Sequence, residues 1–359
     1  MTVDLILKAL SNVQEPDLGK DLVTLNMITD LVVDGDHVSF TIVLTTPACP
    51  MKDLMKNACE NAIKLLVNKQ AIITVNFTSN TTSRRQDEKS VLAQVKNIIA
   101  VVSGKGGVGK STVSANLALA LAEGGAKVGL MDADIYGPSL PILFGETGYK
   151  PDVSSNNRFI PLEKYNVQAM SFGFLADPKQ ATIWRGAIVN KALTQLLNDS
   201  EWNELDVLVI DMPPGTGDIH LTIAQNFPIT ATLVVTTPQD IALLDVGKSI
   251  NMFQKLDIPC LGVVENMSTH ICENCGHESD IFGLGGSARL QEEYGLDLLA
   301  KLPLNLAICQ HSDLGRPIAS LSDNKIADIY IQLAGKVLNQ LATLGKDYSS
   351  LIPPVQTIK

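Results

Sequence analysis

One short segment of the chain combines glycines, two lysines and a hydroxyl group at the spacing that holds polyphosphate. Residues 104–111 match the pattern G-x-x-x-x-G-K-[ST] at every fixed position. In such a loop the backbone N–H groups and the start of the next helix attract anions. Lys110 would reach the terminal phosphates and the Ser111 hydroxyl would bind Mg²⁺. The residues predicted to contact nucleotide are Gly104, Lys105, Gly106, Gly107, Val108, Gly109, Lys110, Ser111 and Thr112.

The segments on either side of this loop support the phosphate-binding interpretation. Residues 97–102 are apolar and β-branched, which predicts a buried strand. Residues 113–121 are rich in Ala and Leu, which predicts a helix. The alternative, a glycine-rich turn that matches by chance, does not require a strand before it and a helix after it.

The loop contains a second lysine, Lys105. A lysine at this position cannot easily fold back onto the phosphates of its own loop. It could reach nucleotide held by a second subunit, as an arginine finger does. The alternative is a solvated surface lysine.

Acidic residues follow two predicted strands. Asp132 and Asp134 stand at the carboxyl end of a strand at residues 127–132, where both can face the phosphates. One could approach Mg²⁺ through water and the other could orient the attacking water. Either could instead cap the helix that follows.

A third acid, Asp211, closes the apolar strand at residues 207–211 and is predicted to support Mg²⁺. A Pro-Pro-Gly loop comes directly after it. The amide of Gly215 in that loop is a candidate sensor of the γ-phosphate. The proline pair could equally form only a tight turn.

Cys272 and Cys275 form the only CxxC among six cysteines. This spacing places two thiolates within reach of one soft metal centre and leaves that centre half-ligated. A two-fold dimer would supply four thiolates, enough for an iron–sulfur cluster or a zinc ion. A zinc site completed by His270 and His277 is an alternative with unusually tight spacing, and a redox dithiol is another. The remaining thiols in apolar sequence surroundings are predicted to be inert core residues: Cys59, Cys260 and Cys309.

The bulk properties restrict the class of protein. A net charge of -10 argues against a nucleic-acid-binding protein. The chain has no 18-residue apolar run that could cross a membrane, and its first residues lack the basic region of a signal peptide. We therefore expect a cytoplasmic protein that binds neither nucleic acid nor membrane.

The order of predicted elements divides the chain into two folded parts. Residues 1–77 predict a small α+β domain with helices at 5–10 and 52–67 and strands at 28–33, 38–44 and 71–77. Residues 78–96 predict a linker, and residues 346–359 a tail. Residues 97–345 alternate strand and helix, which predicts an α/β fold with a mostly parallel sheet covered by helices on both faces. Nucleotide then binds at the carboxyl ends of the strands.

The phosphate-binding loop with Lys105 resembles that of the deviant-Walker P-loop ATPases, the group of MinD, ParA and the nitrogenase iron protein. The resemblance implies that Lys105 acts across a nucleotide-sandwich dimer. It also implies that Asp134 is the aspartate credited with activating water.

Further motifs sharpen the resemblance to the Mrp/ApbC-type iron–sulfur cluster carrier ATPases. They are residues 132–139, 184–186, 211–218, 237–240, 265–267, 272–276 and 313–317. The resemblance covers residues 97–344. It implies a slow ATPase that uses ATP and Mg²⁺, with Cys272 and Cys275 bridging a [4Fe–4S] cluster across a homodimer. Asn266 would contact the adenine, and the cluster would pass to apo iron–sulfur proteins with the help of cluster-assembly factors.

The first domain resembles the small domain fused to many members of this family, through residues 15–19 and 44–51. Cys49 in the second run is either a transient cluster ligand or a buried structural thiol. A MinD- or ParA-like spatial regulator would need a basic surface or an amphipathic tail, and residues 346–359 show little helical patterning. A metabolic ATP-dependent ligase would not need Cys272 and Cys275.

Overall fold

The structure is a computed structural model that describes the chain except residues 15–19, 45–51, 80–91, 176–185, 273 and 345–359. The chain divides into two compact units, residues 1–82 and residues 83–359. Most of the predicted linker and the whole predicted tail lie outside the described residues. No described helix is both long and apolar enough to cross a bilayer.

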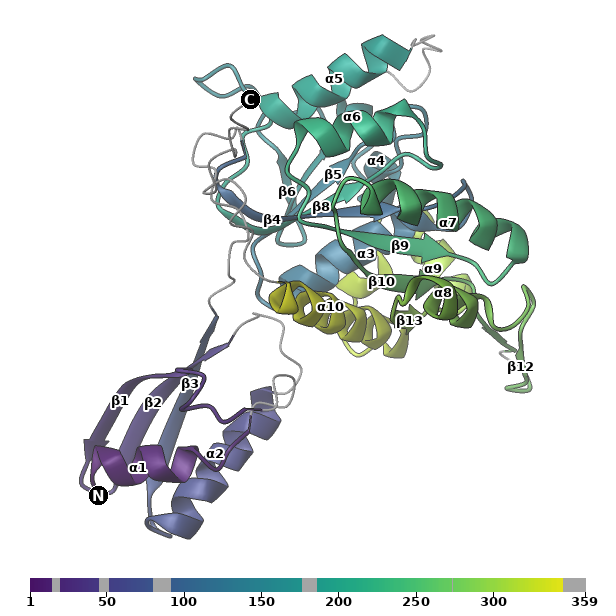
Figure 1. Cartoon of the computed structure of the whole chain (residues 1–359). Helices are drawn as coiled ribbons and strands as arrows, with labels where there is room; N and C mark the ends of the chain where they lie inside the picture. The colour runs from purple at the N-terminus through teal and green to yellow at the C-terminus, as the bar shows by residue number, and fades with distance from the viewer. Residues whose placement is uncertain (15–19, 45–51, 80–91, 176–185, 273, 345–359) are drawn as a thin grey trace, which may run out of the picture. The chain divides into compact units, whose positions relative to one another are not determined.

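The first unit is a three-stranded sheet with two helices (Figure 1). In its sheet β2 pairs antiparallel with β1 and parallel with β3. Alternate residues of β2 are buried, so one face of the sheet forms the core with both helices. Its elements are α1 (Val3–Leu10), β1 (Ile28–Asp34), β2 (His37–Leu44), α2 (Lys52–Leu66) and β3 (Ile72–Ser79).

The second unit contains an eight-stranded sheet in the order β13-β10-β9-β4-β8-β5-β7-β6. Every neighbouring pair is parallel except β6 and β7. The carboxyl ends of the parallel strands therefore share one edge, where a nucleotide site is expected. The strands are β4 (Val95–Val102), β5 (Val128–Asp132), β6 (Leu162–Lys164), β7 (Val167–Ser171), β8 (Leu205–Asp211), β9 (Ala231–Thr236), β10 (Cys260–Glu265) and β13 (Leu298–Lys301).

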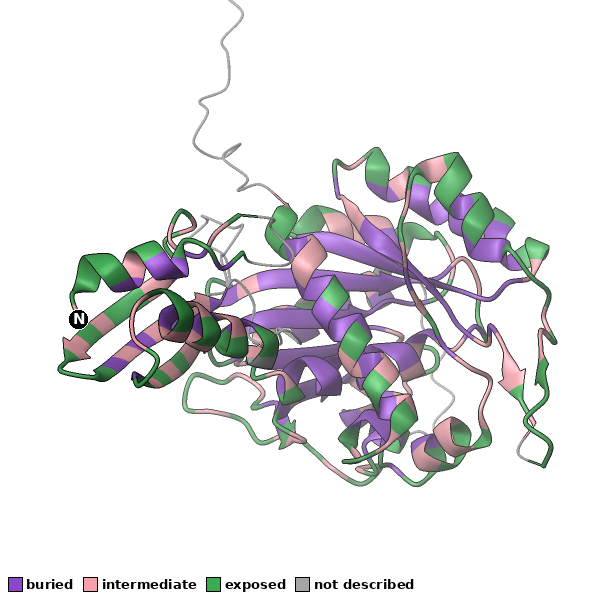
Figure 2. Cartoon of the chain, turned by 90° about the horizontal axis from the view of Figure 1, so that it is seen from below, coloured by how far each residue is buried: buried purple, intermediate pink, exposed green. Residues whose placement is uncertain are grey.

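Helices cover both faces of this sheet, as the sequence predicts (Figures 1 and 2). Strands β5, β8 and β9 are buried at every position because neither face of the sheet meets water. Helix α3 packs against α10 on one side, and α5 packs against α6 on the other. The helices are α3 (Lys110–Glu123), α4 (Leu140–Leu143), α5 (Gly186–Asp199), α6 (Asp218–Asn226), α7 (Asp240–Gln254), α8 (Gly286–Tyr294), α9 (Leu306–Asp313) and α10 (Lys325–Thr343).

Several short elements are absent from the sequence prediction. They are α4, the edge strand β6, α9, and a hairpin of β11 (His270–Ile271) and β12 (Glu278–Ser279). Elements of two to eight residues are too short for a clear periodic pattern. The hairpin is the most consequential of these omissions because it carries the two cysteines of the CxxC motif.

Candidate nucleotide site and cysteine hairpin

The phosphate-binding loop connects β4 to α3, the context that the motif requires. Gly107 and Gly109 have φ angles of 82° and 81°, which non-glycine residues rarely adopt. A Cβ atom on Gly104 would lie 2.5 Å from the backbone of Asp245 in α7. Glycine at this position therefore lets α7 pack directly against the loop.

Lys110 and Asp211 form a buried ion pair at the base of the loop. The Lys110 Nζ atom lies 2.6 Å from Asp211 Oδ1, and the two side chains are 6% and 4% exposed. Ser114, one turn further along α3, donates a hydrogen bond of 2.8 Å to the same carboxylate oxygen. Ser111 Oγ lies 3.4 Å from Lys110 Nζ. Oxygen atoms of the predicted Mg²⁺ residues Ser111 and Asp211 thus both lie near the Lys110 Nζ atom, and oxygen is the ligand that Mg²⁺ prefers.

Asp132 has a structural role in the loop after β5. Its carboxylate accepts hydrogen bonds from the backbone N–H groups of Asp134, Ser139 and Leu140, and from the Ser171 hydroxyl, at 3.0 to 3.1 Å. Burial, followed by the nearby Asp211 charge, raises its pKa to about 7, while the hydrogen bonds oppose the shift. These contacts match the capping role considered from sequence, because the Asp132 oxygens hold the start of α4.

Asp134 is half-buried and faces the same charges. Burial raises its pKa, Lys110 lowers it, and Asp211 raises it. The backbone N–H groups of Tyr136 and Gly137 also stabilise its ionised form. Its carboxylate therefore lies within electrostatic reach of the Lys110–Asp211 pair.

The Gly215 amide is engaged in this structure. It donates a hydrogen bond of 3.0 Å to the Ser103 carbonyl, and its φ angle is 91°. The predicted sensing of a γ-phosphate requires this bond to break. The loop after β8 nevertheless lies beside the phosphate-binding loop, since a Cβ atom on Gly106 would lie 3.9 Å from the Pro214 side chain.

Lys105 is half-exposed. Among the described residues, no hydrogen bond or ion pair engages its ammonium group, and only its carbonyl is used, by the Ser103 hydroxyl. The side chain is therefore available to a group outside the protomer.

Asn266, directly after β10, contacts the phosphate-binding loop itself. Its Nδ2 atom donates a hydrogen bond of 2.8 Å to the Val108 carbonyl, and the side chain is 7% exposed. Its backbone N–H donates to the Thr236 carbonyl at 2.7 Å. This arrangement was not foreseen from sequence, where only an adenine contact was expected.

The two CxxC cysteines lie at the end of the β11–β12 hairpin, which projects from the carboxyl edge of the sheet (Figure 1). The Cys272 N–H donates to the His277 carbonyl, and the Gly276 N–H donates to the Cys272 carbonyl. Cys272 is half-buried and Cys275 is exposed. Among the described residues no group of three or more His, Cys, Asp or Glu side chains converges as a metal site. The zinc site with His270 and His277 is therefore not assembled.

The other described cysteines divide into two kinds. Cys59 is buried, and burial raises its pKa to about 12. Cys260 is half-buried, and burial raises its pKa. The prediction that Cys309 is a core thiol is wrong, because α9 turns this residue to the solvent. Cys49 lies outside the described residues.

His220 is a residue of this region that the sequence did not single out. It lies in α6 just after the loop that follows Asp211, and it is 1% exposed. Neither ring nitrogen has a hydrogen-bond partner among the described residues, and the ring packs edge-on against Phe253 in α7. Burial lowers its pKa to about 4. A single histidine within a helix gives no sequence signal for such a position.

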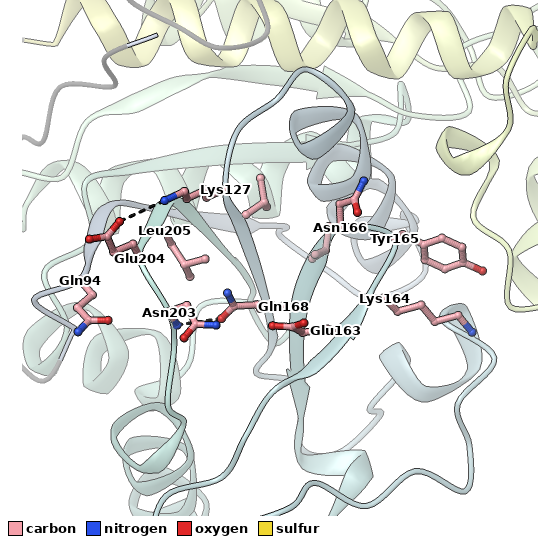
Figure 3. Close-up of a pocket in the computed structure, with 12 residues that line it drawn as sticks. Gln94, Lys127, Glu163, Lys164, Tyr165, Asn166, Gln168, Asn203, Glu204 and Leu205 are labelled. Atoms are coloured by element: carbon pink, nitrogen blue, oxygen red, sulfur yellow. Dashed lines mark hydrogen bonds and ion pairs between the residues drawn. The ribbon is translucent and has the colours of Figure 1, made fainter. Parts of the chain in front are cut away.

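A polar hollow of about 810 Å³ lies at the opposite edge of the sheet (Figure 3). It is lined by residues before or at the amino ends of β4, β5 and β8, among them Gln94, Lys127 and Glu204. Two of its lining residues, Lys127 and Glu204, form an exposed ion pair of 3.1 Å (Figure 3). The hollow contains none of the predicted site residues.

The fold and the loop together define a P-loop NTPase with a mostly parallel sheet. The sequence profile of the ParA family described as "NUBPL iron-transfer P-loop NTPase" matches residues 94–338. The chain belongs to this family. A second profile, described as "iron-sulfur cluster assembly protein", matches residues 4–75 in the first unit.

Individual relatives agree with this assignment. The chain is 45% identical to an iron-sulfur cluster carrier protein of Haemophilus influenzae, over 95% of this chain and 91% of the relative. It is 55% identical to one of Pseudomonas fragi, over 68% of this chain and 85% of the relative. Among solved structures, the nucleotide-binding protein of Archaeoglobus fulgidus in complex with ADP is 36% identical, with a TM-score of 0.59. That alignment covers 68% of this chain and 96% of the other.

Proposed function

We propose that this protein is an ATP-dependent carrier that holds an iron–sulfur cluster between two copies of the chain and passes it to apo-proteins. Family membership and relatives named iron-sulfur cluster carrier protein support the proposal. The observation that carries it is the CxxC hairpin, which presents two thiols at the rim of a nucleotide-binding unit.

The ligand count explains why two copies are needed. A [4Fe–4S] cluster takes four thiolates, and the hairpin offers Cys272 and Cys275 with no third ligand side chain beside them among the described residues. Two hairpins related by a two-fold axis supply four thiolates. A site shared by two chains also opens when they separate, which suits a cluster that is cargo.

In this proposal the nucleotide site controls cluster carriage. When ATP enters, Lys110 turns from Asp211 towards the β- and γ-phosphates, and Asp211 and Ser111 can then support Mg²⁺, which would neutralise phosphate charge. Asp134 orients the water that attacks the γ-phosphorus as the bond to ADP breaks. Lys105 of one protomer stabilises the charge that develops on nucleotide bound to its partner.

Cargo and location follow from the same proposal. Apo iron–sulfur proteins receive the cluster in the cytoplasm, and cluster-assembly factors supply it. The profile match of the first unit to a cluster-assembly protein supports a role for that unit in these exchanges.

Anaerobic reconstitution with iron and sulfide tests the proposal. We expect one cluster per dimer, with absorption at about 410 nm as for thiolate-ligated [4Fe–4S] centres, and loss of that absorption in Cys272→Ala/Cys275→Ala. The exposed Cys309 offers a matched control, because Cys309→Ala removes a thiol on another element. No cluster in the wild type, or equal binding in the double variant, would instead favour a MinD- or ParA-like switch with a zinc or redox CxxC.

A further inference from the structure

We propose that Asn266 is a positioning residue that links the state of the phosphate-binding loop to the cysteine hairpin. The inference deepens the proposed function, since it assigns the physical connection between nucleotide and cluster ligands. It rests on contacts at both ends of a short segment, residues 266–272.

At the nucleotide end, Asn266 is fitted against the loop. Its hydrogen bond to the Val108 carbonyl is buried, and the carbonyl belongs to the peptide that leads into Gly109. A Cβ atom on Gly109 would collide with the Asn266 carboxamide. The loop and the carboxamide therefore occupy complementary space, and a change in the Val108–Gly109 peptide must displace Asn266.

Between Asn266 and the cysteines the chain is held at successive residues. Both the N–H and the hydroxyl of Ser268 donate to the Leu302 carbonyl, at 2.9 and 3.1 Å. The Thr269 carbonyl accepts from the Leu304 N–H at 2.8 Å. His270 then enters the hairpin ladder, and Cys272 continues it. Because hydrogen bonds hold this segment along its length, we expect it to move as one unit. A displacement of Asn266 therefore reaches the Cys272 and Cys275 thiols.

The chain that follows the return strand of the hairpin is held beside the same place. After β12 the chain enters α8, where the Ser287 N–H donates to the Glu265 carboxylate at 2.8 Å. Gly286 packs against the backbone of Pro238, where a Cβ atom would lie 2.8 Å from Pro238 Cα. Glu265 precedes Asn266 directly, so the chain before the hairpin and the helix after it are both anchored next to one residue that contacts the loop.

Nucleotide binding uses the backbone N–H groups of the loop, so it acts on the peptides that Asn266 contacts. The consequence is that nucleotide changes the exposure or spacing of the Cys272 and Cys275 thiols. Such a connection is reciprocal, so a cluster on the cysteines also changes nucleotide affinity.

The test is the alkylation rate of Cys272 and Cys275 in the reduced, cluster-free full chain, resolved by mass spectrometry with and without saturating Mg·ATP or Mg·ADP. In the wild type we expect nucleotide to change the rate at least about fivefold, the lower end of common couplings. In Asn266→Ala the rate should be the same with and without nucleotide, at concentrations that a binding titration shows to be saturating. Saturation separates this role from any contribution of Asn266 to affinity.

Asn266→Asp keeps the size of the side chain but removes the amide donor, and it serves if Asn266→Ala does not fold. Asn305→Asp is the matched control. The Asn305 carboxamide oxygen caps α9, and a carboxylate can do the same. A wild-type rate that nucleotide leaves unchanged, or an Asn266 variant that keeps the full change at saturation, would overturn the inference. Cluster binding is measured separately, so failure of the carrier proposal is distinguishable.

Discussion

The ion pair of Lys110 and Asp211 shows how single residues prepare the site for nucleotide. A buried lysine without a partner would carry a large desolvation cost, and Asp211 offsets it with a contact of 2.6 Å. Phosphate oxygens can replace the carboxylate as partners of Lys110, and Mg²⁺ can replace Lys110 as the partner of Asp211. In the proposed function, charge is thereby balanced both before and after nucleotide binds.

His220 gives a prediction at this scale. Its pKa of about 4 in the fold lies below its ordinary value of 6.5, so the folded state favours the neutral ring. The contribution of the neutral His220 ring to the free energy of unfolding is complete above pH 6.5. It is lost as the pH falls from 6.5 to about 4. We expect the wild type to lose about 3 kcal/mol of unfolding free energy relative to His220→Leu over this window.

Denaturant titrations at several pH values, followed by tryptophan fluorescence, measure this difference. Both tryptophans belong to the second unit, so the signal reports on the unit that contains His220. A difference between the two proteins that stays constant from pH 7 to pH 4 would show that the ring is not held neutral.

At the scale of elements, two glycines join loops that the sequence shows far apart. Gly145 follows α4 and Gly315 follows α9, and a Cβ atom on Gly315 would collide with the Gly145 backbone. The Tyr165 hydroxyl, from the turn between β6 and β7, also donates to the Gly315 carbonyl at 2.8 Å. Three elements omitted from the sequence prediction, α4, α9 and β6, thus meet at one point.

This junction predicts different costs for two glycine substitutions. Gly315 and Gly295 have φ angles of 67° and 66°, but a Cβ atom on Gly295 meets nothing within 4 Å. Gly295→Ala should cost about 1 kcal/mol for its backbone conformation alone. Gly315→Ala should cost about 3 kcal/mol, because overpacking against backbone adds to that. Denaturant titration of both variants checks the difference, and equal costs would argue against the close Gly145–Gly315 contact.

At the scale of the whole molecule, the proposed dimer places Lys105 of one protomer at the nucleotide of the other. Each of the variants Lys105→Ala and Lys110→Ala should then be inactive alone. Mixing the two should restore about a quarter of wild-type ATPase activity, because half of the dimers are mixed and one of their two sites is complete. A steady-state ATPase assay after the protomers have exchanged measures this. Without recovery, Lys105 serves its own protomer.

The local chemistry of the chain could be predicted because it is written in contiguous residues. The loop at 104–111, the acids that end the apolar strands at residues 127–132 and 207–211, and the CxxC pair are patterns of spacing. The strands of the parallel sheet were equally predictable, since most of them are apolar runs of five to eight residues. These features also carried the family resemblance that the profile match confirms.

The partners of these residues were decided only in the folded chain. Lys110 and Asp211 are 101 positions apart, and Asn266 and Val108 are 158 apart, so no local pattern relates them. The sequence alone determined which groups could bind phosphate, Mg²⁺ and a soft metal centre. The tertiary structure decided that Asp132 holds the start of α4, that Cys309 faces the solvent and that Asn266 contacts the phosphate-binding loop. It did so because packing brings distant strand ends to one edge of the sheet, where burial selects which polar groups must pair.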